Sequence, residues 1–250
     1  MDHPRVCPTR RTSFMTGAAC CVTVLVSLLA PPAPARAVSS EDLDRTLTSC
    51  NLVLKNTLEM PDQGIPKDLL QRCKGLAIFP GVVGIGAVVG LSYGNGVVLR
   101  RDDRTGAWTK PAFFTVRGGS IGAQVGAQSV DLILLIMSEE GVQRLLEERF
   151  TLGADIAVSA GPVGRGATAG TSLKFDAGIL SYSRSRGLFA GISLAGARVE
   201  PDDVANAEYH GRDVTVQDVF YEDKGNLSKA GEQLVRDLNT ATHAGTRPTR

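Results

Sequence analysis

One stretch of this sequence matches a catalytic motif letter by letter. Gly118-Gly119-Ser120-Ile121-Gly122 fits the G-x-S-x-G pattern of a nucleophile elbow, in which a serine stands between a strand and a helix. The residues after Ser120 are rich in glycine and β-formers, however, and the chain lacks the repeated strand–helix alternation of that hydrolase fold. We therefore interpret the motif as a glycine-rich turn and expect a protein that is not an enzyme. A serine hydrolase that uses Ser120 is the third-ranked alternative.

Signatures of metals and cofactors are weak. Gly84, Gly86 and Gly90 approximate a dinucleotide-binding fingerprint, but the third glycine comes one residue late, and strand-type residues follow it instead of a helix. Beyond residue 37 the chain has two cysteines and two histidines, and none of them stands at the spacing of a zinc site. We therefore expect neither a cofactor nor a bound metal.

Basic residues in strand-like segments offer a different chemistry, the binding of phosphate. Arg184 and Arg186 stand two residues apart, so on a strand their side chains point to the same face. Neighbouring guanidinium groups suit a phosphate because each can bind it with paired hydrogen bonds. Lys174 lies shortly upstream, and Arg100 and Arg101 end another strand-like run. We predict that these five residues contact phospholipid head groups; the alternative is a solvated hairpin end.

Two cysteines, Cys50 and Cys73, follow residue 37. In an oxidising compartment an even pair favours a disulfide, whose loop closure would contribute about 3 kcal/mol. Two buried free thiols on adjacent helices fit the sequence equally well. The two interpretations stay open, and a count of thiols with and without reduction distinguishes them.

The first 37 residues have the features of a secretory signal peptide. A basic start precedes an apolar run from Phe14 to Leu29, and Ala35-Arg36-Ala37 fits the small-x-small cleavage pattern. This run of about 16 residues is shorter than the roughly 20 that a membrane-spanning helix needs. We predict cleavage after Ala37 and export to the periplasm or cell envelope. Arg10 and Arg11 leave the twin-arginine route open.

The remaining chain is close to neutral. Residues 38–250 hold 23 Lys and Arg against 25 Asp and Glu, so no basic excess remains for non-specific binding of nucleic acid. Their number fits one domain. We predict a single domain over residues 38–242 and a disordered tail over residues 243–250.

Helical periodicity marks both ends and the middle of this domain. The first predicted helix begins at Ser39 or Ser40 and ends before Pro61. Because this helix has more acidic than basic residues, we expect it to pack on the domain instead of lying on a membrane. Its apolar positions are Leu43, Leu47, Cys50, Leu54 and Leu58. Further helices are predicted over 67–74, 139–148 and 226–240, with a short helix or a turn over 201–209.

Between Gly75 and Gly196 the composition changes to glycine mixed with β-forming residues. This stretch holds 22 of the 28 glycines, and its apolar residues distinguish it from a disordered linker. Asn95-Gly96 and residues 102–106 have turn chemistry, which predicts hairpins at both places. Predicted strands cover 76–79, 82–93, 97–100, 112–116, 120–130, 132–137, 154–160, 167–175, 178–183 and 188–197, with 214–216 as a further strand or a turn.

These elements together predict an α+β fold. Its core is a glycine-rich, mostly antiparallel sheet, curved or barrel-like, with N-terminal, central and C-terminal helices. Glycines within strands support the curvature because they mark bulges and tight bends, which a strongly curved sheet requires.

Four segments carry a resemblance to a known family. They are Cys73–Pro80, Gly122–Asp131, Phe150–Asp155 and Ser181–Gly191, and in order and separation they resemble the SYLF domain. The similarity extends over about residues 43–223. Members of this family bind membrane lipids, phosphoinositides in eukaryotes, and some fungal members bind actin. The resemblance therefore implies a lipid-binding module.

The functional expectation combines the resemblance with the predicted export. The leading hypothesis is a module that recognises phospholipid head groups at the cell envelope. The alternative is a structural envelope protein that associates with itself or with a protein partner. Actin follows only from the family and is not expected as the partner of an exported protein.

Overall fold

The computed structural model describes residues 38–60, 64–86, 89–121, 126–147, 150–162, 178–185, 188–189 and 196–243. These residues belong to one compact unit that begins at Val38. The predicted signal peptide, Lys174, Arg186 and the tail after His243 lie outside the described residues, as does the strand predicted over 167–175.

Six helices and nine strands occur in the described part of the chain. The helices are α2 (Ser40–Leu58), α3 (Lys67–Arg72), α4 (Glu139–Arg144), α5 (Asp203–His210), α6 (Val216–Tyr221) and α7 (Lys229–His243). The strands are β1 (Gly75–Gly86), β2 (Val89–Arg100), β3 (Ala112–Ile121), β4 (Gly126–Ile136), β5 (Phe150–Thr151), β6 (Val158–Ala160), β7 (Ile179–Ser185), β8 (Leu188–Phe189) and β9 (Arg198–Pro201).

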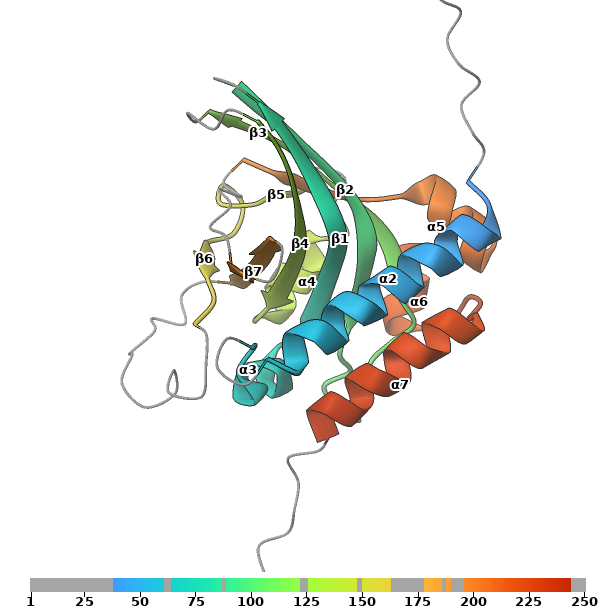
Figure 1. Cartoon of the computed structure of the whole chain (residues 1–250). Coiled ribbons are helices and arrows are strands. Elements are labelled where there is room, and N and C mark those ends of the chain that lie inside the picture. The colour runs from blue at the N-terminus through green and yellow to red at the C-terminus, as the bar shows by residue number, and fades with distance from the viewer. Residues whose placement is uncertain are drawn as a thin grey trace, which may run out of the picture. The chain divides into compact units, whose positions relative to one another are not determined.

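All nine strands join one sheet, in the order β5-β9-β3-β2-β1-β4-β7-β6, with β8 paired to β7. The pairings are antiparallel except that between β6 and β7. The four long strands β1 to β4 bow toward α2, which crosses them with α7 alongside (Figure 1). The predicted α+β fold with a curved, mostly antiparallel sheet is confirmed.

The sheet separates two hydrophobic cores, because side chains alternate between its faces. We call them the helix-side core and the far-side core. In the first, Leu76, Ile78, Val97 and Leu99 pack with apolar residues of α2, α3, α5 and α7. In the second, Ala77, Phe79, Val98 and Phe114 pack with apolar residues of α4 and α6, and Phe114 stacks on Phe220 with ring centroids 6.5 Å apart.

Helix α2 follows the sequence pattern closely. The Ser39 hydroxyl caps it by accepting the N–H of Asp42 at 3.2 Å, and Glu41 and Asp42 lie in the first turn, where the helix dipole favours negative charge. Four of the five predicted apolar positions are buried and Leu58 is partly buried. As expected, the helix packs on the domain.

A bulge in β1 separates two halves of the long strands. In the pairing of β1 with β2 the register shifts between Ile78 and Val83, and in the pairing of β1 with β4 it shifts between Phe79 and Val82. Gly81, inside this bulge, adopts φ +59°. The bulge brings the β1 backbone against β2 at Gly96, where an added Cβ would lie 2.0 Å from the Ile78 carbonyl oxygen. Glycine is therefore required at residue 96.

This close approach corrects one prediction from sequence. Asn95 and Gly96 form no hairpin turn; they lie inside β2, paired with Thr115 and Phe114. The strands predicted over 82–93 and 120–130 are each divided, because 82–86 ends β1 and 120–121 ends β3. The strand or turn predicted over 214–216 precedes a helix that was not predicted: α6 begins at Val216, because Thr215 and Asp218 form a capping box.

Candidate functional site: an uncovered half of the sheet

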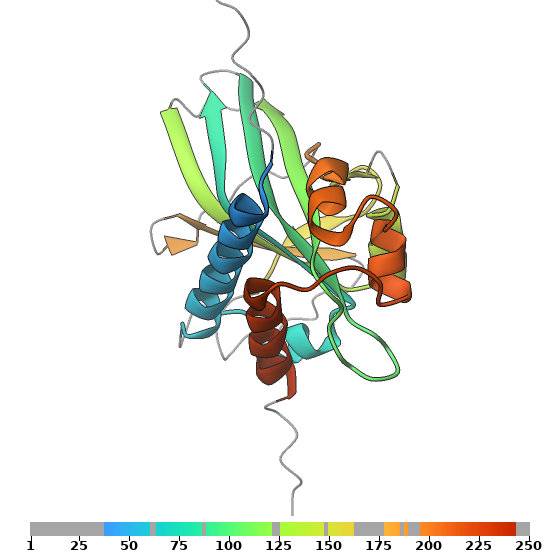
Figure 2. The ribbon, with the colours of Figure 1, turned by 90° about the vertical axis from the view of Figure 1, so that its right-hand side faces the viewer.

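The sheet face that carries α2 is covered over only part of its length. Val97 and Leu99 of β2 point into the helix-side core, and strand alternation places Tyr93 and Asn95 on the same face, where both are exposed. Figure 2 shows the long strands rising beyond the start of α2. This face therefore has a covered half, under the helices, and an uncovered half, beyond the bulge.

A row of side chains crosses the uncovered half from strand to strand. Register pairs join Ser129 on β4 to Val83 on β1, Val83 to Tyr93 on β2, Tyr93 to Arg117 on β3, and Arg117 to Arg198 on β9. Directly paired residues of antiparallel strands point to one face, so the five side chains form a line, called here the Tyr93 row. All five are exposed, Val83 and Tyr93 by 43% and 49%.

Tyr93 and Arg117 are in contact within this row. The guanidinium carbon of Arg117 lies 5.7 Å from the ring centroid of Tyr93, within cation–π range. An exposed pair of this kind contributes only about 0.5–1 kcal/mol. The contact thus orients the guanidinium group while leaving it open to solvent.

The row has positive charge and no acidic member. Neither Arg117 nor Arg198 makes an ion pair within the described residues. Two acids near these strands are engaged by backbone groups: Asp131, the register partner of Arg184, accepts the N–H of Gly81 at 3.0 Å, and Asp155 accepts that of Thr151 at 2.6 Å. Glu200 shares the face but pairs with Thr115, one step toward the covered half. The two guanidinium groups are therefore available to an anionic ligand.

Of the five predicted head-group residues, Arg184 lies on this same face. It is half-buried and pairs across β7 and β4 with Asp131, two residues from Ser129 of the row. Lys174 and Arg186 lie outside the described residues, so their contact with head groups stays a prediction. The Tyr93 row itself was missed from sequence, because it depends on the register of five strands.

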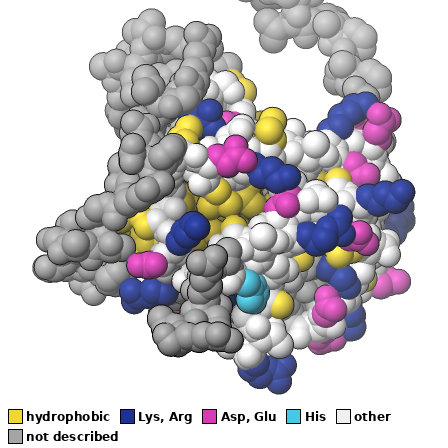
Figure 3. All heavy atoms as spheres, turned by 60° about the horizontal axis from the view of Figure 1, so that its bottom comes forward, with side chains coloured by type: hydrophobic (Ala, Val, Ile, Leu, Met, Phe, Trp, Pro, Cys, Tyr) yellow, Lys and Arg dark blue, Asp and Glu magenta, His cyan; other side chains and the backbone are white. Residues whose placement is uncertain are grey.

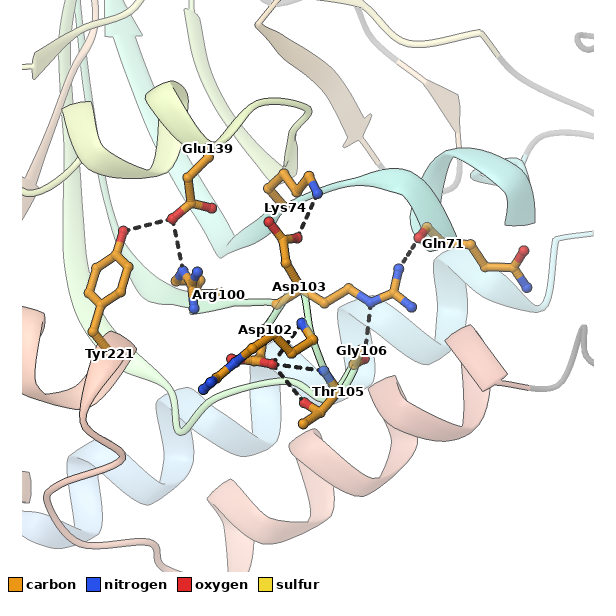
Figure 4. Close-up of polar contacts among 11 residues, drawn as sticks. Gln71, Lys74, Arg100, Asp102, Asp103, Thr105, Gly106, Glu139 and Tyr221 are labelled. Atoms are coloured by element: carbon orange, nitrogen blue, oxygen red, sulfur yellow. Dashed lines mark hydrogen bonds and ion pairs between the residues drawn. The ribbon is translucent and has the colours of Figure 1, made fainter.

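Arg100 belongs to the opposite end of β2 and is held by local partners. Its Nε donates to Glu139 Oε1 at 3.1 Å, and its guanidinium carbon lies 4.3 Å from the ring centroid of Tyr221. The Tyr221 hydroxyl donates to the same Glu139 oxygen at 2.9 Å (Figure 4). Arg100 is 9% exposed, so its side chain joins β2 to α4 and α6 and plays a structural part there.

The hairpin after Arg100 is likewise bound to its surroundings. Arg101 donates to the backbone carbonyls of Gln71 and Gly106, and Lys74 pairs with Asp103 at 2.5 Å (Figure 4). The face shown in Figure 3 mixes Lys and Arg with Asp and Glu around a hollow where hydrophobic side chains are visible. Arg100 and Arg101 are thus engaged by nearby groups of the protein, whereas Arg184, Arg117 and Arg198 make no ion pair among the described residues.

Both cysteines are free, buried thiols in the structure. The Cys50 thiol lies 3.5 Å from the carbonyl oxygen of Ile78, and the Cys73 thiol lies 3.2 Å from that of Leu70. Burial raises the pKa of Cys50 and raises that of Cys73 to about 12, which disfavours the reactive thiolate. The interpretation as buried thiols fits this state, and the thiol count described above remains the test of a bridge.

The G-x-S-x-G motif lies in a strand. Ser120 belongs to β3 and pairs with Gly90 of β2, and β4 begins already at Gly126. Downstream, His210 is buried with its Nε2 2.9 Å from the carbonyl of Pro111, and His243 lies in the last turn of α7. Ser120 therefore lies within a strand and not at the strand-to-helix turn of a nucleophile elbow.

The described residues include no group of three or more His, Cys, Asp or Glu side chains that could hold a metal ion. None of the helices described has both the length and the apolarity needed to cross a bilayer.

Comparison with known proteins identifies the family. The family described as "Ysc84: Las17-binding protein actin regulator" matches residues 117–241. The chain is 33% identical to LAS seventeen-binding protein 3 of Saccharomyces cerevisiae over 185 residues. These residues make up 73% of this chain and 40% of the relative. It is 32% identical over 215 residues to Protein YSC84 of the same species, which is 85% of this chain and 45% of the relative.

A mammalian relative shows a similar level of identity. The chain is 32% identical over 183 residues to SH3 domain-containing YSC84-like protein 1 of Rattus norvegicus, which is 73% of this chain and 53% of the relative. The chain thus spans about half the length of the curated relatives it matches, or somewhat less. These relatives are named as binding or domain-containing proteins and not as enzymes. The chain belongs to the Ysc84 family, whose domain is the SYLF domain.

Proposed function

We propose that this domain binds phospholipid head groups at a membrane surface and catalyses no reaction. The observation that carries the proposal is the uncovered half of the sheet, where Arg117, Arg198 and Arg184 share one face without an ion pair among the described residues. Guanidinium groups bind phosphate well because their fork of N–H donors matches phosphate oxygens. A nearly neutral protein with local positive charge suits reversible attachment to an anionic surface.

Vesicle co-sedimentation tests this proposal. The purified protein should pellet with phosphatidylcholine vesicles that contain phosphatidylglycerol, less with phosphatidylcholine alone, and less as salt rises, because salt screens exposed charges. Replacing Arg117 and Arg198 by Ala should weaken binding about fivefold for each arginine, from about 1 kcal/mol per charge at an anionic surface. Arg212→Ala is the matched control, because Arg212 is exposed but lies outside the uncovered half.

A protein partner is the second candidate. The names of the relatives support it, since LAS seventeen-binding protein 3 is named for binding another protein. Self-association as an envelope scaffold belongs to the same class of function. A stable oligomer in light scattering that is indifferent to anionic vesicles would favour this candidate over lipid binding.

The proposal also includes export. It rests on the predicted signal peptide, and the expected mature protein begins at Val38. Intact-mass measurement of protein recovered from the envelope fraction tests it. A mass that includes residues 1–37 would contradict cleavage after Ala37.

A further inference from the structure

The Tyr93 row contains the one pair of exposed large apolar residues that are direct neighbours among those described. Exposed large apolar side chains in this part of the chain are Leu52, Val83, Tyr93, Val204 and Tyr221. Leu52, Val204 and Tyr221 lie on three different helices, α2, α5 and α6. Single exposed apolar residues are normal on a protein surface. Val83 and Tyr93, by contrast, are register partners on adjacent strands.

The positive charges lie on both sides of this apolar pair. Along the sheet, Arg117 and Arg198 follow Tyr93 on β3 and β9, while Arg184 lies beyond β4 on β7. Adjacent strands are about 4.8 Å apart, so the backbones of Arg184 and Arg117 are separated by roughly 19 Å. One phosphate cannot bridge that separation. The arrangement suits an array of phosphates and not one small ligand in a pocket.

The chemistry of the row matches the boundary between lipid head groups and acyl chains. Tyrosine has an apolar ring and a polar tip, and it is enriched where membrane meets water. Arg117, held over the Tyr93 ring, could bind a lipid phosphate while the ring enters the interface beside it. Val83 adds apolar surface next to the ring.

Resting on the proposed function, we infer that the Tyr93 row is a membrane-contact strip for an assembled anionic bilayer. Tyr93 and Val83 enter the interface, and Arg117, Arg198 and Arg184 hold separate lipid phosphates around them. The uncovered end of the sheet therefore faces the membrane, and α2 packs on the domain instead of inserting. A free head group in solution engages one arginine at a time and binds weakly.

A tryptophan at position 93 tests this strip directly. The chain has one tryptophan, Trp108, which is 5% exposed and reports little of the surface. Emission of Tyr93→Trp should shift to the blue on addition of vesicles that contain phosphatidylglycerol, and lipids brominated near the head group should quench it. Soluble glycerophosphoglycerol should cause no shift. Tyr221→Trp is the matched control and should not respond, because that tyrosine lies on α6, which packs against the other face of the sheet.

Two outcomes would overturn the strip and leave the proposed function standing. We expect Tyr93→Ser to bind vesicles about fivefold more weakly, because it loses apolar surface. The first contrary outcome is that Tyr93→Trp binds vesicles without a spectral change and Tyr93→Ser binds them as tightly as the native protein. The other is full competition by glycerophosphoglycerol, which would indicate a pocket for one head group. Absence of vesicle binding in the native protein would overturn both proposals and favour a protein partner. Circular dichroism of each variant confirms that it is folded.

Discussion

Two arginine–tyrosine pairs lie toward opposite ends of the long strands and on opposite faces of the sheet, and they differ in what surrounds them. At the covered end, on the face that carries α4 and α6, Arg100 lies over Tyr221 and both side chains bond to Glu139. At the uncovered end, Arg117 lies over Tyr93 with no carboxylate bound to either among the described residues. The first pair, called here the closed pair, has its charge neutralised. The second, the open pair, keeps its charge without a bound carboxylate among the described residues.

The comparison shows that residue type does not decide the role of an arginine in this sheet. Arg100 is 9% exposed and connects three elements, so its removal should damage the fold. Arg117 is exposed and contacts one ring, so its removal should leave the fold intact. The bulge at Gly81, with Gly96 beside it, separates the two environments within one set of strands. Stability and binding should therefore respond to different substitutions.

The largest effect is expected where the two halves of the sheet meet. Gly96→Ala would place a Cβ 2.0 Å from the Ile78 carbonyl oxygen, which the backbone cannot accommodate without moving. We expect a loss of more than about 4 kcal/mol in the free energy of unfolding, measured by urea denaturation. Gly84→Ala is the control in the uncovered half, because its Cβ would meet no atom within 4 Å, and it should change stability by less than about 1 kcal/mol. Similar stabilities for the two variants would contradict the bulge packing.

The second prediction compares the loss of Arg100 with the loss of Arg117. Arg100→Met should cost about 3 kcal/mol in urea denaturation, because it leaves the Glu139 carboxylate without its cation in a site where one of its oxygens is buried and unpaired. Arg117→Met should change stability by less than about 0.5 kcal/mol.

Vesicle binding should show the reverse order for the same two variants. Arg117→Met should weaken it about fivefold, and folded Arg100→Met should bind like the native protein. Binding that Arg100→Met reduces and Arg117→Met spares would place the lipid site at the covered end.

Several local features of the fold could be predicted from the sequence. Ser39 and Ser138 cap α2 and α4 as their positions indicated, and the turn chemistry of residues 102–106 forms the expected turn, in which Asp102 accepts from Thr105. These features depend on residues a few positions apart. The role of Arg100 could not be predicted, because Tyr221 and Glu139 are 82 residues apart in the chain and meet only in the fold.

The open pair escaped prediction for a related reason. Arg184 and Arg186 could be predicted as neighbours from sequence alone, because residues two positions apart on one strand point to the same face. Tyr93 and Arg117 share a face only through the register of β2 and β3. The Asn95-Gly96 dipeptide predicted a turn, so the strand that carries Tyr93 was predicted to end before residue 95, whereas β2 continues to Arg100. Register across strands is the information that local pattern lacks.

The third prediction concerns pH. Burial lowers the pKa of His210 from its ordinary 6.5, and the hydrogen bond to Pro111 only partly opposes this. His210 packs edge-on to Tyr209 with ring centroids 4.7 Å apart, and nearby Lys110 further disfavours its charge, although the backbone of Asn226 favours it. The unfolded chain therefore binds a proton that the folded chain resists, so stability should fall as pH drops below about 6.5.

Urea denaturation at a series of pH values measures this dependence. His210→Gln should flatten it above about pH 4, since Asp218, with its pKa lowered to about 2 by the Thr215 hydrogen bonds, contributes only in more acid solution. Vesicle binding by the open pair should not change between about pH 4 and about pH 6.5, because arginine keeps its charge over this range. Binding that weakens in parallel with stability would mean that His210 and the open pair are not independent.

The smallest effects separate the two tyrosines. Tyr221→Phe keeps the ring under Arg100 but removes the hydroxyl that donates to Glu139 at 2.9 Å, so we expect a loss of about 1 kcal/mol in the free energy of unfolding. Tyr93→Phe removes a hydroxyl with no hydrogen bond among the described residues, and it should leave stability unchanged. Double-mutant cycles combine Tyr221→Phe with Arg100→Met and Tyr93→Phe with Arg117→Met. The coupling free energy should be larger in the closed pair, because both of its side chains bond to Glu139 and the open pair shares no carboxylate among the described residues. Equal coupling in the two pairs would show that the ring contact, and not Glu139, distinguishes a structural arginine from one available for binding.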